Sequence, residues 1–76
     1  MSAAHTKPEQ AMLIGVVAIP VRKDGFTVCV SDGPYRGQEF FVSEQGVHPS
    51  LGDEVELVLV VESRHVISWK EYPNWD

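Results

Sequence analysis

Few residues of this chain have the types and spacing that catalysis or metal binding requires. The histidines His5, His48 and His65 are far apart, and no His-x-x-x-His or Cys-x-x-Cys pair of the kind that binds zinc is present. Cys29 lies in an apolar run without a basic neighbour that would activate its thiol. The glycine-containing segment 32–37 lacks the Lys-Ser/Thr of a phosphate-binding loop. We therefore expect no enzyme, no metal and no cofactor.

Aromatic and basic residues are better candidates, because together they can stack on bases and contact the phosphates of a single-stranded nucleic acid. The chain has eleven acidic and six basic residues, for a formal net charge of −5, which opposes strong binding to a phosphate backbone. We expect any such binding to be weak. The candidate residues are Phe41, Phe26, Tyr35, Arg36, Lys23 and Arg22.

A second group of residues predicts a protein-binding surface instead. Its glutamates and valines alternate along one strand, and aromatic residues, which are enriched at protein interfaces, follow near the end of the chain. The alternative function is therefore an acidic module that docks on a protein or ribonucleoprotein partner. We expect a monomer, although the two valines are also compatible with a dimer edge. The residues are Glu54, Glu56, Val58, Val60, Trp69, Tyr72 and Trp75.

The elements that must position these residues are short strands. Alternating apolar and polar residues, or short apolar β-branched runs, predict strands at 11–21, 26–31, 38–43, 54–61 and 65–69. Turn-forming residues separate them, beginning with the Asp24-Gly25 pair. Gly15 predicts a bend in the first strand, and Pro20 must lie at its end or at an edge. The segment 44–53 is too broken for a long helix, although one short helical turn would fit.

Five short strands with an irregular insertion after the third predict a small all-β OB-fold barrel, and an SH3-like barrel is the alternative because sequence does not fix strand order. We expect a flexible leader at 1–10, one domain at 11–72 and a tail at 73–76. No apolar stretch approaches the about 20 residues of a membrane span, and a single cysteine suits a reducing compartment. These features predict a cytoplasmic protein without a membrane partner.

The strands also carry a family resemblance. The landmarks GVV, DGFTVCV, FFVSE, GDEVELVLVVE and HVISWKE, spread over residues 15–71, resemble those of the ribosomal "S-one" RNA-binding domain. GVV, GFTVCV, FFVS and the Gly-Asp turn are similar to the cold-shock domain over a shorter stretch. Both families stack single-stranded bases on the outer face of their second and third strands. The resemblance thus implies a protein that binds single-stranded RNA or DNA weakly.

Residue by residue, the resemblance and strand alternation agree for one aromatic residue and disagree for another. Phe41 matches the exposed aromatic of the cold-shock pattern, and alternation also places it outward with Glu39 and Ser43. Phe26 would be exposed by the family pattern, whereas hydrophobic alternation would bury it with Val28. The family's other basic and aromatic positions are largely replaced here. Alternation also leaves open whether Trp69 fills the core rather than an interface, with Tyr72 over it.

Overall fold

The structure, a computed structural model, describes residues 9–72 and folds them into five β-strands. The strands are β1 (Gln10–Arg22), β2 (Gly25–Val30), β3 (Glu39–Ser43), β4 (Glu54–Val60) and β5 (His65–Glu71). Their ends differ from the predicted ones by at most two residues, so the all-β prediction is confirmed. Residues 1–8 of the predicted leader and the tail, Trp75 included, lie outside the described residues. Gln10, placed in the leader from the sequence, is the first residue of β1.

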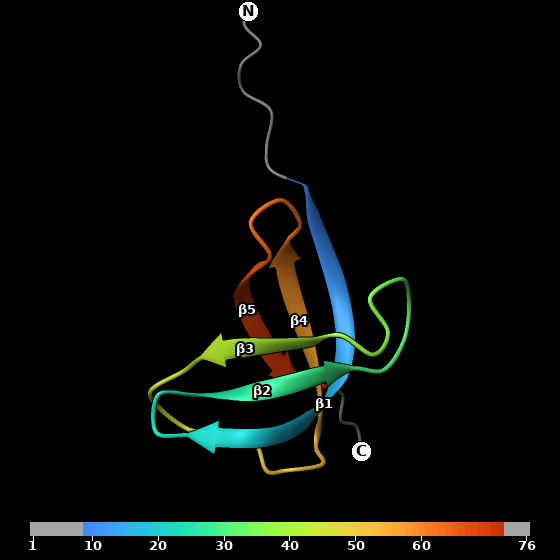
Figure 1. Cartoon of the computed structure of the whole chain (residues 1–76). Coiled ribbons are helices and arrows are strands. Elements are labelled where there is room, and N and C mark those ends of the chain that lie inside the picture. The colour runs from blue at the N-terminus through green and yellow to red at the C-terminus, as the bar shows by residue number, and fades with distance from the viewer. Residues whose placement is uncertain (1–8, 73–76) are drawn as a thin grey trace, which may run out of the picture.

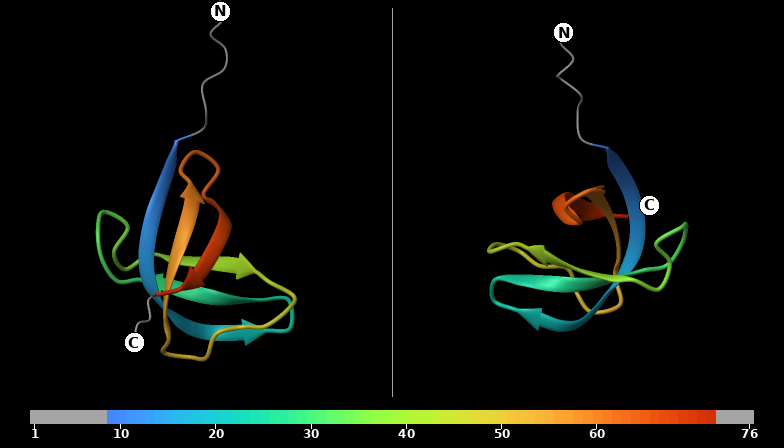
Figure 2. Two further views of the ribbon diagram at one scale, coloured as in Figure 1. Left: turned by 180° about the vertical axis from the view of Figure 1, so that it is seen from behind. Right: turned by 45° about the horizontal axis from the view of Figure 1, so that its top comes forward.

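The strands form one antiparallel sheet in the order β3-β2-β1-β4-β5. Because β4 pairs with β1 rather than with β3, the first four strands have the 4-1-2-3 order of a Greek key. This order agrees with a small OB-like barrel, which is a partly open Greek-key barrel. The sheet curls on itself, with β3 and β5 as its two ends (Figures 1 and 2).

The long strand β1 belongs to both halves of the curled sheet. Its first part pairs with β4 and its second part with β2, and Gly15 and Val16 pair with both neighbours. The predicted bend lies here: a Cβ atom on Gly15 would come within 2.6 Å of the Cys29 carbonyl oxygen and of Val28 Cγ1. Glycine therefore allows β1 and β2 to approach closely where the strand passes from one half-sheet to the other. Pro20 lies where the β1–β2 register shifts.

Hydrophobic alternation decides which residues fill the barrel. Phe26 and Val28 on β2 are each 0% exposed, so the burial that alternation predicted for them is confirmed. Thr27, which alternation placed on the outside, is also buried, at 6% exposed. The expectation that Phe26 stacks bases is corrected, because its ring lies inside the core. The buried apolar residues are Leu13, Val17, Phe26, Val28, Val30, Phe40, Val42, Val55, Leu57 and Leu59.

The connection between β3 and β4 closes one end of the barrel without a helix. Its His48 ring lies 5.8 Å from the Phe26 ring, and Pro49 is buried. Trp69 of β5 meets the same Phe26 ring edge-on at 5.0 Å. Trp69 therefore packs on the core. Of the two possibilities that the sequence left open, a core position and an interface position, the structure shows the first. Within residues 9–72 no helix is long and apolar enough to cross a membrane.

Candidate nucleic-acid interface

Phe41 is the exposed aromatic residue on the outer face of β2 and β3. Its side chain is 43% exposed, and it pairs with Thr27 on β2. A Cβ atom on Gly25, the diagonal neighbour, would come within 2.6 Å of Phe41 Cε2 and Cζ. The ring therefore lies over Gly25, in space that the side chain of any residue other than glycine at this position would occupy. One side of the ring is supported by β2, which makes it a candidate platform for a stacked base.

On β1 and β2 the side chains beside this ring are small, and along β3 it is flanked by the exposed Glu39 and Ser43. Ala18, Thr27 and Phe41 form one cross-strand row over β1, β2 and β3. Thr27 Oγ1 donates a hydrogen bond to the Pro20 carbonyl oxygen at 3.1 Å, which satisfies the hydroxyl within the protein. Small, internally satisfied neighbours leave Phe41 as the main group that a ligand can contact on this row.

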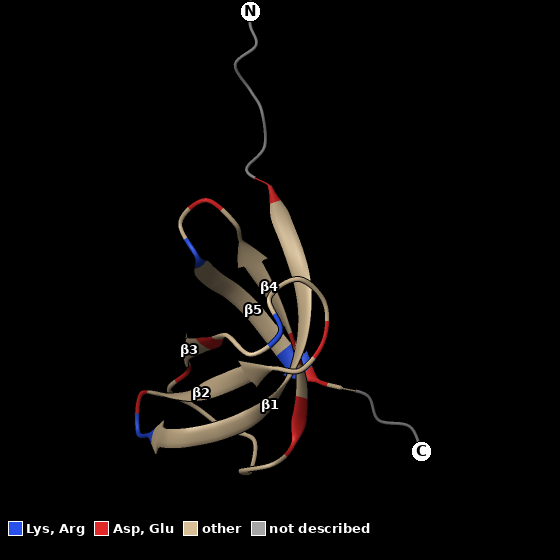
Figure 3. Ribbon diagram, turned by 45° about the vertical axis from the view of Figure 1, so that its right-hand side comes forward, with Lys and Arg blue, Asp and Glu red and all other residues tan. Residues whose placement is uncertain are grey.

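Two of the predicted basic residues, Arg22 and Lys23, lie at one end of the outer face of β2 and β3. Arg22 pairs with Gly25, which pairs with Ser43, so Arg22 belongs to the row next to that of Phe41. Lys23 follows in the exposed β1–β2 turn. An acidic residue stands nearby as well, since Asp24 shares the turn. Figure 3 shows basic and acidic residues side by side at this turn.

The other two predicted residues of this interface lie at the opposite end of β2. Tyr35 packs edge-on against Phe40, with ring centroids 6.2 Å apart, and is half-buried. Arg36 is exposed in the same β2–β3 loop. The structure thus brings together Phe41, Arg22 and Lys23, whereas Tyr35 and Arg36 are separated from them by the length of β2.

Arg64 fastens the β4–β5 turn to β3, a structural role that the sequence did not predict. Its guanidinium carbon lies 5.0 Å from the centroid of the Phe40 ring, and its Nη2 donates a hydrogen bond to Gln38 Oε1 at 2.6 Å. Arg64 has a φ of 57°, in the left-handed region that non-glycine residues adopt rarely. A contact across 26 residues leaves no local sequence signal by which it could have been found.

The predicted protein-binding residues lie on another outer face, formed by β1, β4 and β5. Glu54 is exposed there, and Glu56, Val58 and Val60 are half-buried. The face also contains Met12, which pairs with Val58 and is 67% exposed, and which the sequence interpretation did not include.

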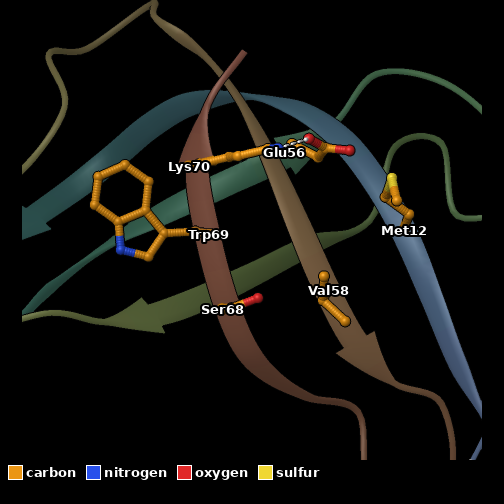
Figure 4. A pocket seen from close by; sticks show the side chains of 6 residues that line it. All are labelled: Met12, Glu56, Val58, Ser68, Trp69 and Lys70. Carbon is orange, nitrogen blue, oxygen red and sulfur yellow. Dashed lines mark ion pairs between the residues drawn. The ribbon is translucent and has the colours of Figure 1, made fainter. Parts of the chain in front are cut away.

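This face contains a shallow hollow of about 210 Å³ (Figure 4). Met12 and Val58 line one side of it, and Glu56 lies 3.5 Å from Lys70 Nζ in an ion pair on the other. The Trp69 ring points to the opposite side of β5. Tyr72 is 39% exposed and lies farther along, where its N–H donates to the Glu54 carbonyl oxygen. The acidic and aliphatic residues of the second set therefore lie together. Trp69 also borders the hollow, but its ring packs on the core instead.

Glu44 connects the end of β3 to β5. Its carboxylate accepts hydrogen bonds from Trp69 Nε1 at 2.9 Å and from the Gly46 N–H at 3.1 Å. These bonds, that of Trp69 first, hold the pKa of the Glu44 carboxyl group below its ordinary value of 4.5. The His48 ring nitrogen Nε2 contacts the Glu44 carbonyl oxygen. Within residues 9–72 no three His, Cys, Asp or Glu side chains are grouped to hold a metal ion.

Comparisons of the chain with known protein families, with curated proteins and with solved structures find no match. Its function is therefore inferred from the geometry of the two outer faces.

Proposed function

We propose that this protein binds single-stranded nucleic acid weakly, with a base stacked on Phe41 and the adjoining phosphates near Arg22 and Lys23. The single observation that carries the proposal is the position of the Phe41 ring, which is 43% exposed and lies over Gly25. The resemblance to the "S-one" domain favours RNA as the ligand.

Stacking supplies most of the affinity in this proposal. A base on an aromatic side chain contributes about 1–3 kcal/mol by alanine substitution. Two phosphate contacts would give a salt slope of about −1.4, since each contact on a single strand contributes about −0.7. The formal net charge of −5 repels a polyanion over the rest of the surface. Binding should therefore be weak, and its salt dependence should be shallow.

An NMR titration tests the proposal. Isotope-labelled protein is titrated with oligouridylate and oligothymidylate at 20 mM and 150 mM salt, roughly the range over which two phosphate contacts are detectable. We expect shifts concentrated at Phe41, Gly25, Arg22 and Lys23. With the slope of about −1.4, the affinity should fall roughly 17-fold at the higher salt concentration. Unchanged spectra at the lower salt concentration, or shifts confined to the face of Met12 and Val58, would contradict the proposal.

A protein-docking function is the second candidate, and Met12 favours it. A methionine that is 67% exposed beside Val58 is an apolar contact on a sheet face that also carries Glu54 and Glu56. Such a face suits a partner with an apolar contact ringed by basic residues. Met12→Ala should weaken binding of such a partner and leave binding of oligouridylate unchanged, so the two functions are separable.

A further inference from the structure

The curled sheet has two end strands, β3 and β5, and no ladder joins them within residues 9–72. Side chains bridge them instead: Trp69 donates to Glu44, and Arg64 donates to Gln38. An end strand that lacks a neighbour presents backbone N–H and C=O groups along its outer edge, and these groups can pair with an added strand.

The hydrogen bonds between β2 and β3 identify the backbone groups that lie on this edge. The Val30 N–H donates to the Gln38 carbonyl and the Glu44 N–H donates to the Asp24 carbonyl, in the same register as the ladder between them. In an antiparallel pair every second residue bonds to the partner strand. The even-numbered residues of β3 therefore bond to β2. The backbone groups of Phe41 and Ser43 point away from it.

The two end strands are protected to different degrees. In β5 the register with β4 shifts between Ser68 and Val66, so that Ile67 is an extra, bulged residue. Bulges and lysines are devices that keep edge strands from pairing with other chains, and β5 has both, Lys70 being its lysine. The sequence of β3, EFFVS, contains no lysine and no proline, and its register with β2 is regular. Among the described residues, the edge of β3 thus has no backbone ladder to β5 and lacks the two protective features of β5.

A groove of about 290 Å³ lies along the last residues of β3, between them and β5. It is lined by Val42, Ser43, Glu44, Val66, Ile67, Ser68 and Trp69. Glu44 is the charged residue among them, and the whole chain is acidic, with a formal net charge of −5. Electrostatic complementarity therefore selects a basic occupant.

We propose that the edge of β3 binds an extended, basic peptide segment of a partner protein as an added antiparallel strand. The Phe41 and Ser43 backbone groups would pair with the peptide, and a lysine or arginine of the peptide would lie near Glu44. Main-chain hydrogen bonds supply the affinity in this mode of recognition, and side chains in the groove supply the selectivity. The proposal does not depend on nucleic-acid binding, which uses the Phe41 side chain on the outer face of the sheet.

The test uses the synthetic peptide acetyl-Lys-Val-Thr-Val-Lys-Val-amide and amide hydrogen exchange of the full chain. Binding should slow exchange of the Phe41 and Ser43 amides at least tenfold, with little change at Val42 and Glu44, which already donate to β2. A peptide of the same length and charge with Pro-Pro in place of the central Thr-Val cannot form the ladder. It should leave all four rates unchanged.

Ser43 provides a matched pair of variants. Ser43→Pro removes the edge N–H without removing a bond to β2 and should weaken peptide binding at least tenfold, whereas Ser43→Ala should bind as the native chain does. Equal binding of the two peptides by the native chain would overturn the proposal, even if Ser43→Pro does not fold. Exchange at Phe41 and Ser43 that does not change at millimolar peptide would overturn it as well.

Discussion

The two outer faces of this sheet are built from equivalent outward-pointing positions, yet they favour different partners. Around Phe41 the neighbours on β1 and β2 are small, Glu39 is exposed beside it on β3, and Arg22 stands one row away. Around Met12 the neighbours are aliphatic, and the charges are those of Glu54 and of the Glu56–Lys70 pair. We therefore expect a polyanion to be tolerated at the first face and repelled at the second. Under the two proposed functions, one fold would separate two binding chemistries by side-chain choice alone.

The largest effect is expected from Gly25→Ala, which adds a methyl group to β2 where the Phe41 ring packs on the first face. The added methyl group would collide with the Val42 carbonyl oxygen and lie 2.6 Å from Phe41 Cε2 and Cζ, and overpacking of this kind costs about 1–3 kcal/mol. Both the free energy of unfolding and the binding of oligouridylate should fall. Chemical denaturation and the NMR titration measure the two effects. Gly46→Ala, in the exposed loop after β3, is the matched control and should leave binding unchanged.

Phe41→Ala compared with Met12→Ala tests the difference between the faces directly. Loss of the stacking ring should weaken oligouridylate binding by about 1–3 kcal/mol per base, which is about five-fold to more than a hundred-fold. Met12→Ala should leave this affinity unchanged. Fluorescence anisotropy of a labelled oligonucleotide gives both values. Equal losses in the two variants would mean that the faces are not functionally distinct.

Arg22→Gln should have a smaller effect, visible mainly in the salt dependence. Removing one phosphate contact lowers the slope of log affinity against log salt by about 0.7. The matched control is Lys70→Gln, because Lys70 lies on the other face and pairs with Glu56. A salt series of binding curves measures both slopes. If Lys70→Gln lowers the slope and Arg22→Gln does not, the ligand binds the face of Met12 and Val58 rather than that of Phe41.

The smallest effect concerns the Glu44–Trp69 hydrogen bond, which ties the strand carrying Phe41 to the half-sheet carrying Met12. Because the Trp69 bond lowers the pKa of Glu44, its stabilisation is fully present above the ordinary value of 4.5 and is lost as the pH falls through the lower folded value. Trp69 fluorescence should therefore shift as the pH falls below 4.5, before the chain unfolds. In Glu44→Gln this transition should be absent, and its persistence would assign it to another group.

Much of the fold follows from local sequence signals. Strand positions come from alternation and from turn residues such as Asp24 and Gly25, and alternation also gave the burial of Phe26. The outward position of Phe41 follows from the same rule. Where alternation and the family pattern disagreed on β2, alternation was right, because a fully buried phenylalanine stabilises a core this small.

The parts of the site that the sequence did not predict depend on contacts between residues that are far apart in the chain. Nothing near Met12 in the sequence indicates that Val58 lies beside it, and the fit of the Phe41 ring over Gly25 requires the register of β2 and β3. The packing of Arg64 on Phe40 depends likewise on the position of the β4–β5 turn. Such contacts are set by strand order, which sequence alternation alone does not determine.

The sharing of β1 between two half-sheets has a consequence for how the chain is made. During synthesis β1 can pair with β2 early, but its first residues must wait for β4, since Gln10 pairs with Val60. Until then the Leu13 side of β1 remains uncovered. Non-local pairings of this kind are typical of domains that fold in milliseconds to seconds rather than microseconds. The newly made chain should therefore depend on protection from aggregation until its last strands leave the ribosome.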